Sequence, residues 1–102
     1  MDIETHEEVI NATLQILTLV KEKIIDGSDI TTTRFNSVSE FRFLLDTYVY
    51  QVKHGDLSAF QILKSEFAPT ASLQEHSISN GWAREFLILA KRFDNLYNEI
   101  NK

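Results

Sequence analysis

The chain has no cysteine, and it has only three glycines and one proline among its 102 residues. Without cysteine it can form neither disulfide bonds nor thiolate metal ligands, and it has no thiol nucleophile. A glycine-rich phosphate loop needs clustered glycines, whereas Gly27, Gly55 and Gly81 are isolated. These absences exclude a disulfide scaffold, and they argue against a fold of many short strands joined by tight turns.

The sequence also lacks any apolar run near the ~20 residues that a transmembrane helix needs. Its N-terminus is acidic, whereas a secretory signal begins basic and continues apolar. We therefore expect a soluble, cytoplasmic protein without membrane contact. The formal charge is −5, but much of it comes from the first eight residues, where carboxylates also favour the start of a helix. The acidity alone does not indicate a basic partner.

What the sequence does contain favours helices. Leu, Ile, Glu, Lys and Ala occur in long runs, and 43% hydrophobic residues are enough for one modest core. We predict a single all-α domain over residues 1–102. Its predicted architecture is an antiparallel helix bundle of four main helices, with an extra short helix near residues 70–79.

The first helix is predicted to begin at Thr5, which has capping-box spacing to Glu8, and to end at Asp26-Gly27. Its inward residues occupy a broad arc, which implies contact with two neighbouring helices: Val9, Ile10, Thr13, Leu14, Ile16, Leu17, Val20 and Ile24. Residues 28–37 are predicted to form an extended loop, and Ile30 and Phe35 are expected to pack this loop against the bundle.

Capping residues and apolar spacing also predict the next two helices. Ser37 caps the second, which ends at His54-Gly55 and has the core stripe Val38, Phe41, Leu45, Tyr48 and Val52. Asp56 caps the third, which ends before Pro69 and runs antiparallel to the second. The third helix is expected to bury Leu57, Phe60, Leu63 and Phe67.

Ser72-Leu73-Gln74-Glu75 is another capping-box match, where a short helix would begin. The last helix is predicted to start near Gly81, with Ser79 or Asn80 as its cap. Its apolar residues form one narrow seam: Trp82, Phe86, Leu89, Phe93, Leu96 and Ile100. We therefore interpret Trp82 as a core residue whose indole N–H binds a nearby carbonyl or hydroxyl.

Patterns for catalysis and metal binding are missing from the sequence. His6, His54 and His76 are far apart, and none has a second ligand at helical spacing. Glu75 beside His76 comes nearest to an acid–base pair, and we interpret it as part of a solvated loop. The ten basic residues are dispersed, which argues against direct nucleic-acid binding. We predict no catalytic residue, no metal ligand and no cofactor.

The outer side of the second helix carries the sharpest functional signal. Phe43 and Tyr50 lie opposite its core stripe at 100° per residue, and Asp46 and His54 flank them on that side. An aromatic pair rimmed by charge is typical of a surface that binds a protein partner. The predicted partner-binding residues are therefore Phe43, Asp46, Tyr50 and His54.

Alternatives exist for both unexplained apolar pairs. Loop 28–37 or the residues around Leu73 would bury Phe43 and Tyr50 if they folded over that side of the second helix. Leu87 and Ile88 lie outside the seam of the last helix. They mark either a dimer face or a second core contact, and we favour the core contact.

A resemblance to a known family begins near the middle of the chain. The segment Gly55-Asp56-Leu57-Ser58-Ala59-Phe60-Gln61-Ile62-Leu63 follows a helix and precedes a linker and a closing helix. Over residues 44–97 this arrangement resembles small helical immunity proteins of bacterial toxin and contact-dependent inhibition systems. The resemblance implies a non-catalytic cytoplasmic protein that binds and neutralises a cognate toxin domain. Mild net acidity would suit steering toward a basic nuclease toxin.

Two other classes of function compete with a protein-binding module. The first is an enzyme or ligand-binding bundle with a site between helices near Trp82, Tyr48 and His76. The second is a homo-oligomeric structural or regulatory protein that uses the aromatic pair, or Leu87 and Ile88, for self-contact. We favour the protein-binding module because only the second helix shows a surface that core packing does not explain.

Overall fold

Five α-helices make up all the regular secondary structure of residues 3–101, which are the residues that this computed structural model describes. Side chains are described from His6 onward. The helices are α1 (Ile3–Lys23), α2 (Val38–Lys53), α3 (Ser58–Glu66), α4 (Ser72–Ser79) and α5 (Ala83–Ile100). The predicted all-α class is confirmed, and so is the extra short helix near residues 70–79.

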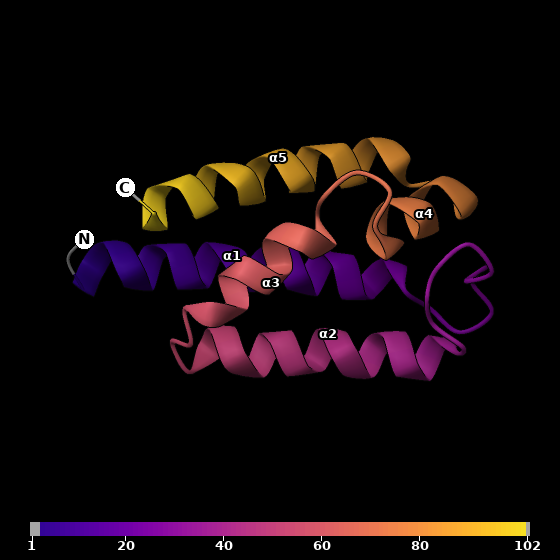
Figure 1. The fold of residues 1–102 in the computed structure, drawn as a ribbon, viewed down its shortest axis with the longest axis horizontal. Coiled ribbons are helices and arrows are strands. Elements are labelled where there is room, and N and C mark those ends of the chain that lie inside the picture. The colour runs from indigo at the N-terminus through magenta and orange to yellow at the C-terminus, as the bar shows by residue number, and fades with distance from the viewer. Residues whose placement is uncertain (1–2, 102) are drawn as a thin grey trace.

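The long helix α1 lies between α2 and α5 and contacts both (Figure 1). The colour gradient of the ribbon shows that α2 and α5 run opposite to α1. On one side of this three-helix layer, formed by α1, α2 and α5, α3 crosses obliquely and contacts α2 and α5, while α4 packs against α5. The prediction that the first helix has two helical neighbours is confirmed.

The first helix begins earlier than predicted, at Ile3 rather than Thr5. The side chain of Thr5, and with it the predicted capping box, lies outside the described residues. From His6 onward, exposed and buried residues of α1 fall on opposite sides of the helix. The buried residues match the predicted inner arc, and the chain just beyond the helix adds Ile24: Val9, Thr13, Ile16, Leu17, Val20 and Ile24.

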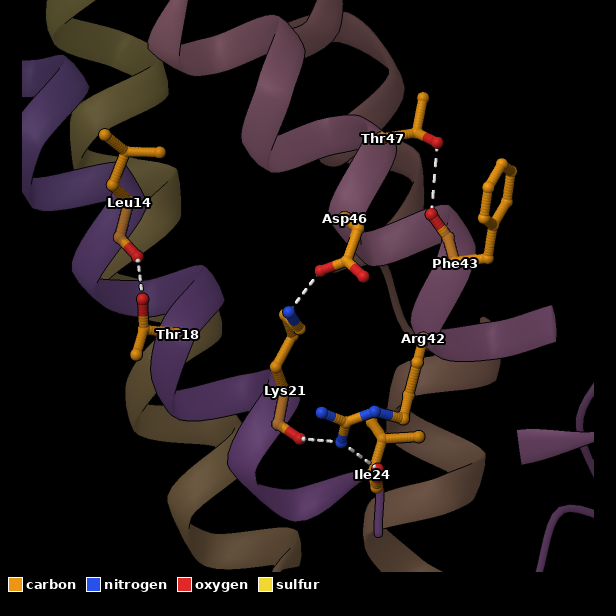
Figure 2. Close-up of polar contacts among 8 residues, drawn as sticks. All are labelled: Leu14, Thr18, Lys21, Ile24, Arg42, Phe43, Asp46 and Thr47. Carbon is orange, nitrogen blue, oxygen red and sulfur yellow. Dashed lines mark hydrogen bonds and ion pairs between the residues drawn. The ribbon is translucent and has the colours of Figure 1, made fainter. Parts of the chain in front are cut away.

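The second helix fixes the C-terminal end of α1. The prediction that this end lies at Asp26 is wrong, because α1 stops at Lys23. The guanidinium of Arg42 in α2 donates hydrogen bonds to the carbonyls of Lys21 (3.0 Å) and Ile24 (2.6 Å) (Figure 2). The Lys21 carbonyl also accepts the Ile24 N–H at 3.1 Å, and a positive group at the last carbonyls of a helix complements the helix dipole, so Arg42 caps this end of α1.

Both ends of α2 and its core stripe agree with the sequence prediction. The hydroxyl of Ser37 accepts the Glu40 N–H at 3.0 Å, as an N-cap should. Just beyond Lys53, Gly55 takes a left-handed conformation with φ of 75°, which only glycine adopts without strain. The stripe is buried except for its half-buried first residue: Val38, Phe41, Leu45, Tyr48 and Val52.

The start of α3 differs slightly from the prediction. The carboxylate of Asp56 accepts both the N–H (3.0 Å) and the hydroxyl (2.6 Å) of Ser58, which makes a turn that precedes the helix. Leu57 is 44% exposed, so the prediction that it faces the core is wrong. It falls at the edge of the helical arc, and Ala59 is buried in its place, with Phe60, Leu63 and Phe67 buried as predicted.

The helix α4 begins where predicted but does not use the predicted cap. The hydroxyl of Ser72 accepts the backbone N–H of Arg34 at 3.1 Å, so it holds the α1–α2 loop (residues 24–37) rather than its own helix. Ala71 occupies the N-cap position without a side-chain bond. The capping-box pattern therefore identified the helix but not the role of its serine.

Neither Ser79 nor Asn80 caps α5, although both were candidates. The amide group of Asn80 bonds to the backbone of Asp29, accepting its N–H and donating to its carbonyl, each at 2.8 Å. Ser79 pairs with Thr32 at 3.1 Å between hydroxyl oxygens. Both side chains are used to fasten the α1–α2 loop, so Trp82 takes the N-cap position.

The seam of α5 forms one wall of the core, as predicted. Trp82, Phe86, Leu89 and Phe93 are buried, whereas Leu96 and Ile100 are half-buried. Aromatic rings fill much of the interior, and Phe93 packs against Phe67 of the chain after α3 with ring centroids 4.9 Å apart. The interpretation of Trp82 as a core residue is confirmed. The predicted anchors of the loop, Phe35 and Ile30, also pack against the core.

One buried polar group in the core has no partner. Thr13 is fully buried in α1, and its hydroxyl makes no hydrogen bond to the described residues. A buried hydroxyl without a partner costs roughly 1–3 kcal/mol. Thr13 is therefore a weak point in an otherwise apolar face of α1.

We expect Thr13→Val to raise the free energy of unfolding by about 1 kcal/mol, because it replaces the unpaired hydroxyl with a methyl of similar size. Urea denaturation followed by circular dichroism measures this change. Thr18→Val is the matched control: its hydroxyl is exposed and bonds to the Leu14 carbonyl at 2.9 Å, so only a few tenths of a kcal/mol are expected. A lower free energy of unfolding for Thr13→Val would contradict the conclusion that the Thr13 hydroxyl has no hydrogen-bond partner.

Candidate functional site

The outer surface of α2, defined by Phe43, Tyr50 and His54, is the most exposed apolar feature of the described residues. Phe43 is 73% exposed and Tyr50 is 64% exposed, the highest values among the large hydrophobic side chains. The alternative in which another segment covers these rings is wrong. Leu73 is buried in the core, and Phe35 of the α1–α2 loop stacks on Phe41, which belongs to the inner stripe.

Tyr50 and His54 form one continuous aromatic platform at the end of α2. Their ring centroids are 4.1 Å apart, and their planes are inclined by 31°. The Nδ1 atom of His54 lies 2.8 Å from the carbonyl oxygen of Tyr50. A carbonyl only accepts, so Nδ1 carries the proton and Nε2 of the neutral ring keeps a lone pair. The two contacts restrict both side chains before any partner arrives.

Asp46 lies at the edge of this surface rather than beside the rings. Its carboxylate forms an ion pair with Lys21 of α1, and Figure 2 shows it directed toward α1 while Phe43 points away. Arg42 is also turned toward α1, where it caps the helix end. The sequence predicts that Asp46 flanks the rings as a partner-binding residue, whereas the structure directs its carboxylate toward α1 and pairs it with Lys21, a contact that periodicity does not reveal.

A second candidate site is the polar cluster around His76, which is fully buried despite its predicted place in a solvated loop. The indole Nε1 of Trp82 donates to Nδ1 of His76 at 2.9 Å, and Nε2 of His76 lies 2.9 Å from the hydroxyl of Ser28. That hydroxyl donates to the carbonyl of Ile25 at 2.7 Å. The sequence-based hypothesis of a site near Trp82 and His76 did not include Ser28, because Ser28 and His76 come from distant parts of the chain.

The hydrogen bonds fix which protons the cluster carries. An indole N–H can only donate, so Nδ1 of His76 must accept and the proton of the neutral ring is on Nε2. The imidazole therefore donates to Ser28 and offers it no lone pair. A serine is activated as a nucleophile only when the histidine accepts its proton, so this arrangement holds the loop in place rather than activating Ser28.

Charge around His76 comes from one acidic neighbour. Burial lowers the pKa of His76 below its ordinary value of 6.5, while the Asp29 carboxylate acts against that shift. Hydrogen bonds from the Thr31 side chain and backbone lower the pKa of Asp29 itself, so Asp29 stays charged. The neutral imidazole is the form that the folded chain favours.

The hypothesis of a site near Trp82, Tyr48 and His76 is only partly realised. Trp82 and His76 are in contact, but Tyr48 belongs to a different polar group with Glu66 and Arg34. Burial, followed by the nearby Glu66 carboxylate, raises the pKa of Tyr48 to about 12. An open pocket of ≈ 500 Å³ does adjoin Trp82, yet the ring is only 4% exposed and its N–H is already bonded.

Leu87 and Ile88 differ from the prediction of a second core contact. They are 59% and 60% exposed on α5, so that interpretation is wrong. The packed side of α5, which contacts α1, α3 and α4, consists of its seam together with Ala90 and Tyr97. Leu87 and Ile88 therefore remain available as surface.

Metal-binding clusters and membrane-spanning helices are both missing from the part of the chain that the structure describes. There, three or more His, Asp or Glu side chains do not come together in a way that could hold a metal ion. Likewise, none of these helices has the length and apolar character required to cross a bilayer. Comparison with protein families, curated proteins and solved structures found no match.

Acid is expected to destabilise the fold through His76. Above pH 6.5 the ring is neutral in both the folded and the unfolded chain, and its full contribution to stability is present. As the pH falls below 6.5, the unfolded chain binds a proton first, so the free energy of unfolding decreases until the lowered folded-state pKa is reached. Protonation also removes the lone pair that binds Trp82.

Urea denaturation across this pH range measures the effect against two variants. His76→Gln should be less stable at neutral pH, and its stability should decline less between pH 6.5 and the acid limit of folding. His54→Gln is the control, because it removes an exposed imidazole outside the cluster around His76. Parallel curves for the wild type and His76→Gln would show that the buried ring does not control the acid response.

Proposed function

We propose that this chain is a non-catalytic protein-binding module and that it binds its partner through the outer surface of α2. The observation that carries the proposal is the exposure of Phe43 and Tyr50, 73% and 64%, on a helix whose other side is fully packed. Aromatic side chains bury large areas with few rotatable bonds, which is why they are enriched among residues that dominate binding energy.

The contacts within this surface support a binding role. Tyr50 and His54 restrict each other, so little conformational freedom is lost when a partner covers them. The hydroxyl of Thr47, which lies between the two rings along α2, donates to the Phe43 carbonyl at 3.0 Å (Figure 2). The hydroxyl proton of Thr47 therefore already has an acceptor. A partner that covers Thr47 would leave no donor without a hydrogen bond. Polar atoms that remain free, such as His54 Nε2, would provide specificity at the rim.

The polar groups elsewhere support a role without catalysis. His76 and Ser28 bond to each other with the wrong proton arrangement for nucleophilic attack. Glu66, the one buried carboxylate of the described side chains, pairs with Arg34 at 2.9 Å. These groups fasten the α1–α2 loop to α3 and α4, and we assign them a structural role.

We propose a toxin domain as the partner, as the resemblance to small helical immunity proteins implies. A net charge of −5 would favour encounter with a basic domain. Arg42 is turned inward to cap α1, so it does not add positive charge to the outer surface of α2. The proposal includes a cytoplasmic location, no cofactor and no direct nucleic-acid binding. Its scaffold is the antiparallel bundle of four main helices predicted from the sequence, with α4 as the extra short helix.

We expect the double variant Phe43→Ala/Tyr50→Ala to lose binding without losing stability. If a toxin domain is encoded beside the gene for this chain, that domain is the probe, and calorimetric titration measures its affinity. Removing two central aromatic anchors should weaken binding by about 100-fold or more. The thermal midpoint should change little, because both rings are exposed.

The matched control is Ile62→Ala/Ile78→Ala, which removes two exposed side chains from α3 and α4 and should leave affinity unchanged. A double aromatic variant that binds as tightly as the wild type would overturn the binding surface. If the wild-type chain does not bind the toxin domain, the proposed partner class is wrong. A large loss of thermal stability would show that the rings contribute to folding.

A further inference from the structure

The three-helix layer is covered on one side only. α3 crosses the side of the layer that faces the viewer in Figure 1, and it contacts α2 and α5 there. The buried residues of α1 face that side, while its exposed residues form a stripe along the opposite side: Asn11, Gln15, Thr18, Leu19 and Glu22. None of the helices of residues 3–101 lies across this stripe. We call the side of the layer that carries the stripe the open side.

A shallow apolar groove runs along the open side between α1 and α5. Two depressions of ≈ 220 Å³ and ≈ 130 Å³ share Leu19 as a lining residue. Leu19 is 41% exposed, and Ile88, which lines the smaller depression, is 60% exposed. The same depression contains Lys23 and Glu85, whose ion pair of 2.7 Å joins the two helices. The groove therefore has an apolar centre at Leu19 and Ile88, beside an ion pair that joins α1 and α5.

Opposite charges lie on the two sides of this centre. Glu22 follows Leu19 by three residues, or about 4.5 Å along the helix axis. Arg92 lines the larger depression together with Ala12 and Gln15, on the other side of Leu19. Both charges are exposed, and neither makes an ion pair within the described residues. The open side thus carries an apolar centre with one unpaired charge of each sign, one on either side.

We propose that the open side binds a second copy of this chain about a two-fold axis that crosses α1 at right angles near Leu19. Such an axis makes the two copies of α1 antiparallel, so Glu22 of each copy meets Arg92 of the other. Leu19 and Ile88 of both copies then pack at the centre. An axis parallel to α1 would instead place Glu22 against Glu22, and like charges in contact disfavour that arrangement.

This dimer does not depend on the proposed function and is compatible with it. α2 lies beside α1, and the ring of Phe43 points away from α1 (Figure 2). Each copy would therefore keep the outer surface of α2 free, and the dimer would present two such surfaces. The self-contact thus differs from the sequence-based hypothesis, which used Phe43 and Tyr50 or the pair Leu87 and Ile88.

Sedimentation equilibrium of the full chain over a wide concentration range tests the proposal. The wild type should show a monomer–dimer equilibrium, and Leu19→Asp should remain monomeric. Glu22→Arg and Arg92→Glu should each raise the dimer dissociation constant by about tenfold or more, since each places like charges in contact. The double variant Glu22→Arg/Arg92→Glu should return close to the wild-type value, because it restores both pairs with reversed sign.

Arg84→Glu is the matched control, an exposed charge reversal in the first turn of α5 that should leave the equilibrium unchanged. Circular dichroism confirms that each variant is folded, and the rescue in the double variant separates a charge contact from general destabilisation. A wild type that stays monomeric at every concentration would overturn the proposal. Dimerisation that ignores both charge reversals, or that is lost in Phe43→Ala/Tyr50→Ala, would place the contact elsewhere and equally overturn it.

Discussion

The hydrogen-bonded imidazole of His76 holds together the parts of this chain that lack helical packing of their own. One ring nitrogen accepts from Trp82 at the start of α5, and the other donates to Ser28 in the α1–α2 loop. The ring also lies edge-on to Phe41 of α2, with centroids 5.7 Å apart. Because a buried polar group must be paired, these two hydrogen bonds tie the α1–α2 loop to the start of α5.

Around this centre, the loop is held mainly by side chains that look like helix caps in the sequence. Ser72 and Asn80 bond to loop backbone, and Arg34 reaches Glu66 in α3. A segment of this length with little secondary structure would leave many backbone groups without partners. Ser72 at the start of α4 and Asn80 just beyond its end supply three of those partners, and His76 within α4 bonds to the Ser28 side chain.

Two charged residues of α2 lie on the flank that faces α1, and its exposed aromatic rings lie on the other flank. Arg42 and Asp46 face α1, where they cap its last carbonyls and pair with Lys21. The aromatic rings are left on the far side, with a partially restricted Tyr50–His54 pair. The open side of the layer differs in kind, because it combines scattered apolar residues with unpaired charges of both signs. The first is the surface that we propose for a foreign partner, and the second is the surface that we propose for a second copy.

The sequence by itself determined the helical class, the core stripes of α2 and α5, and the direction of Phe43 and Tyr50 away from the stripe of α2, whereas the structure showed that no other segment covers these two rings. Each of these follows from apolar spacing within one helix, since a regular helix converts spacing directly into direction. Leu87 and Ile88 show the limit of this reasoning. Their spacing showed that they point away from the seam of α5, but it did not show whether another segment covers them. Only the tertiary structure decided that Ser72 and Asn80 hold the loop, that Asp46 pairs with α1, and that His76 is buried. These roles depend on residues from distant segments, whose meeting is set by packing of the whole chain and leaves no mark in local periodicity.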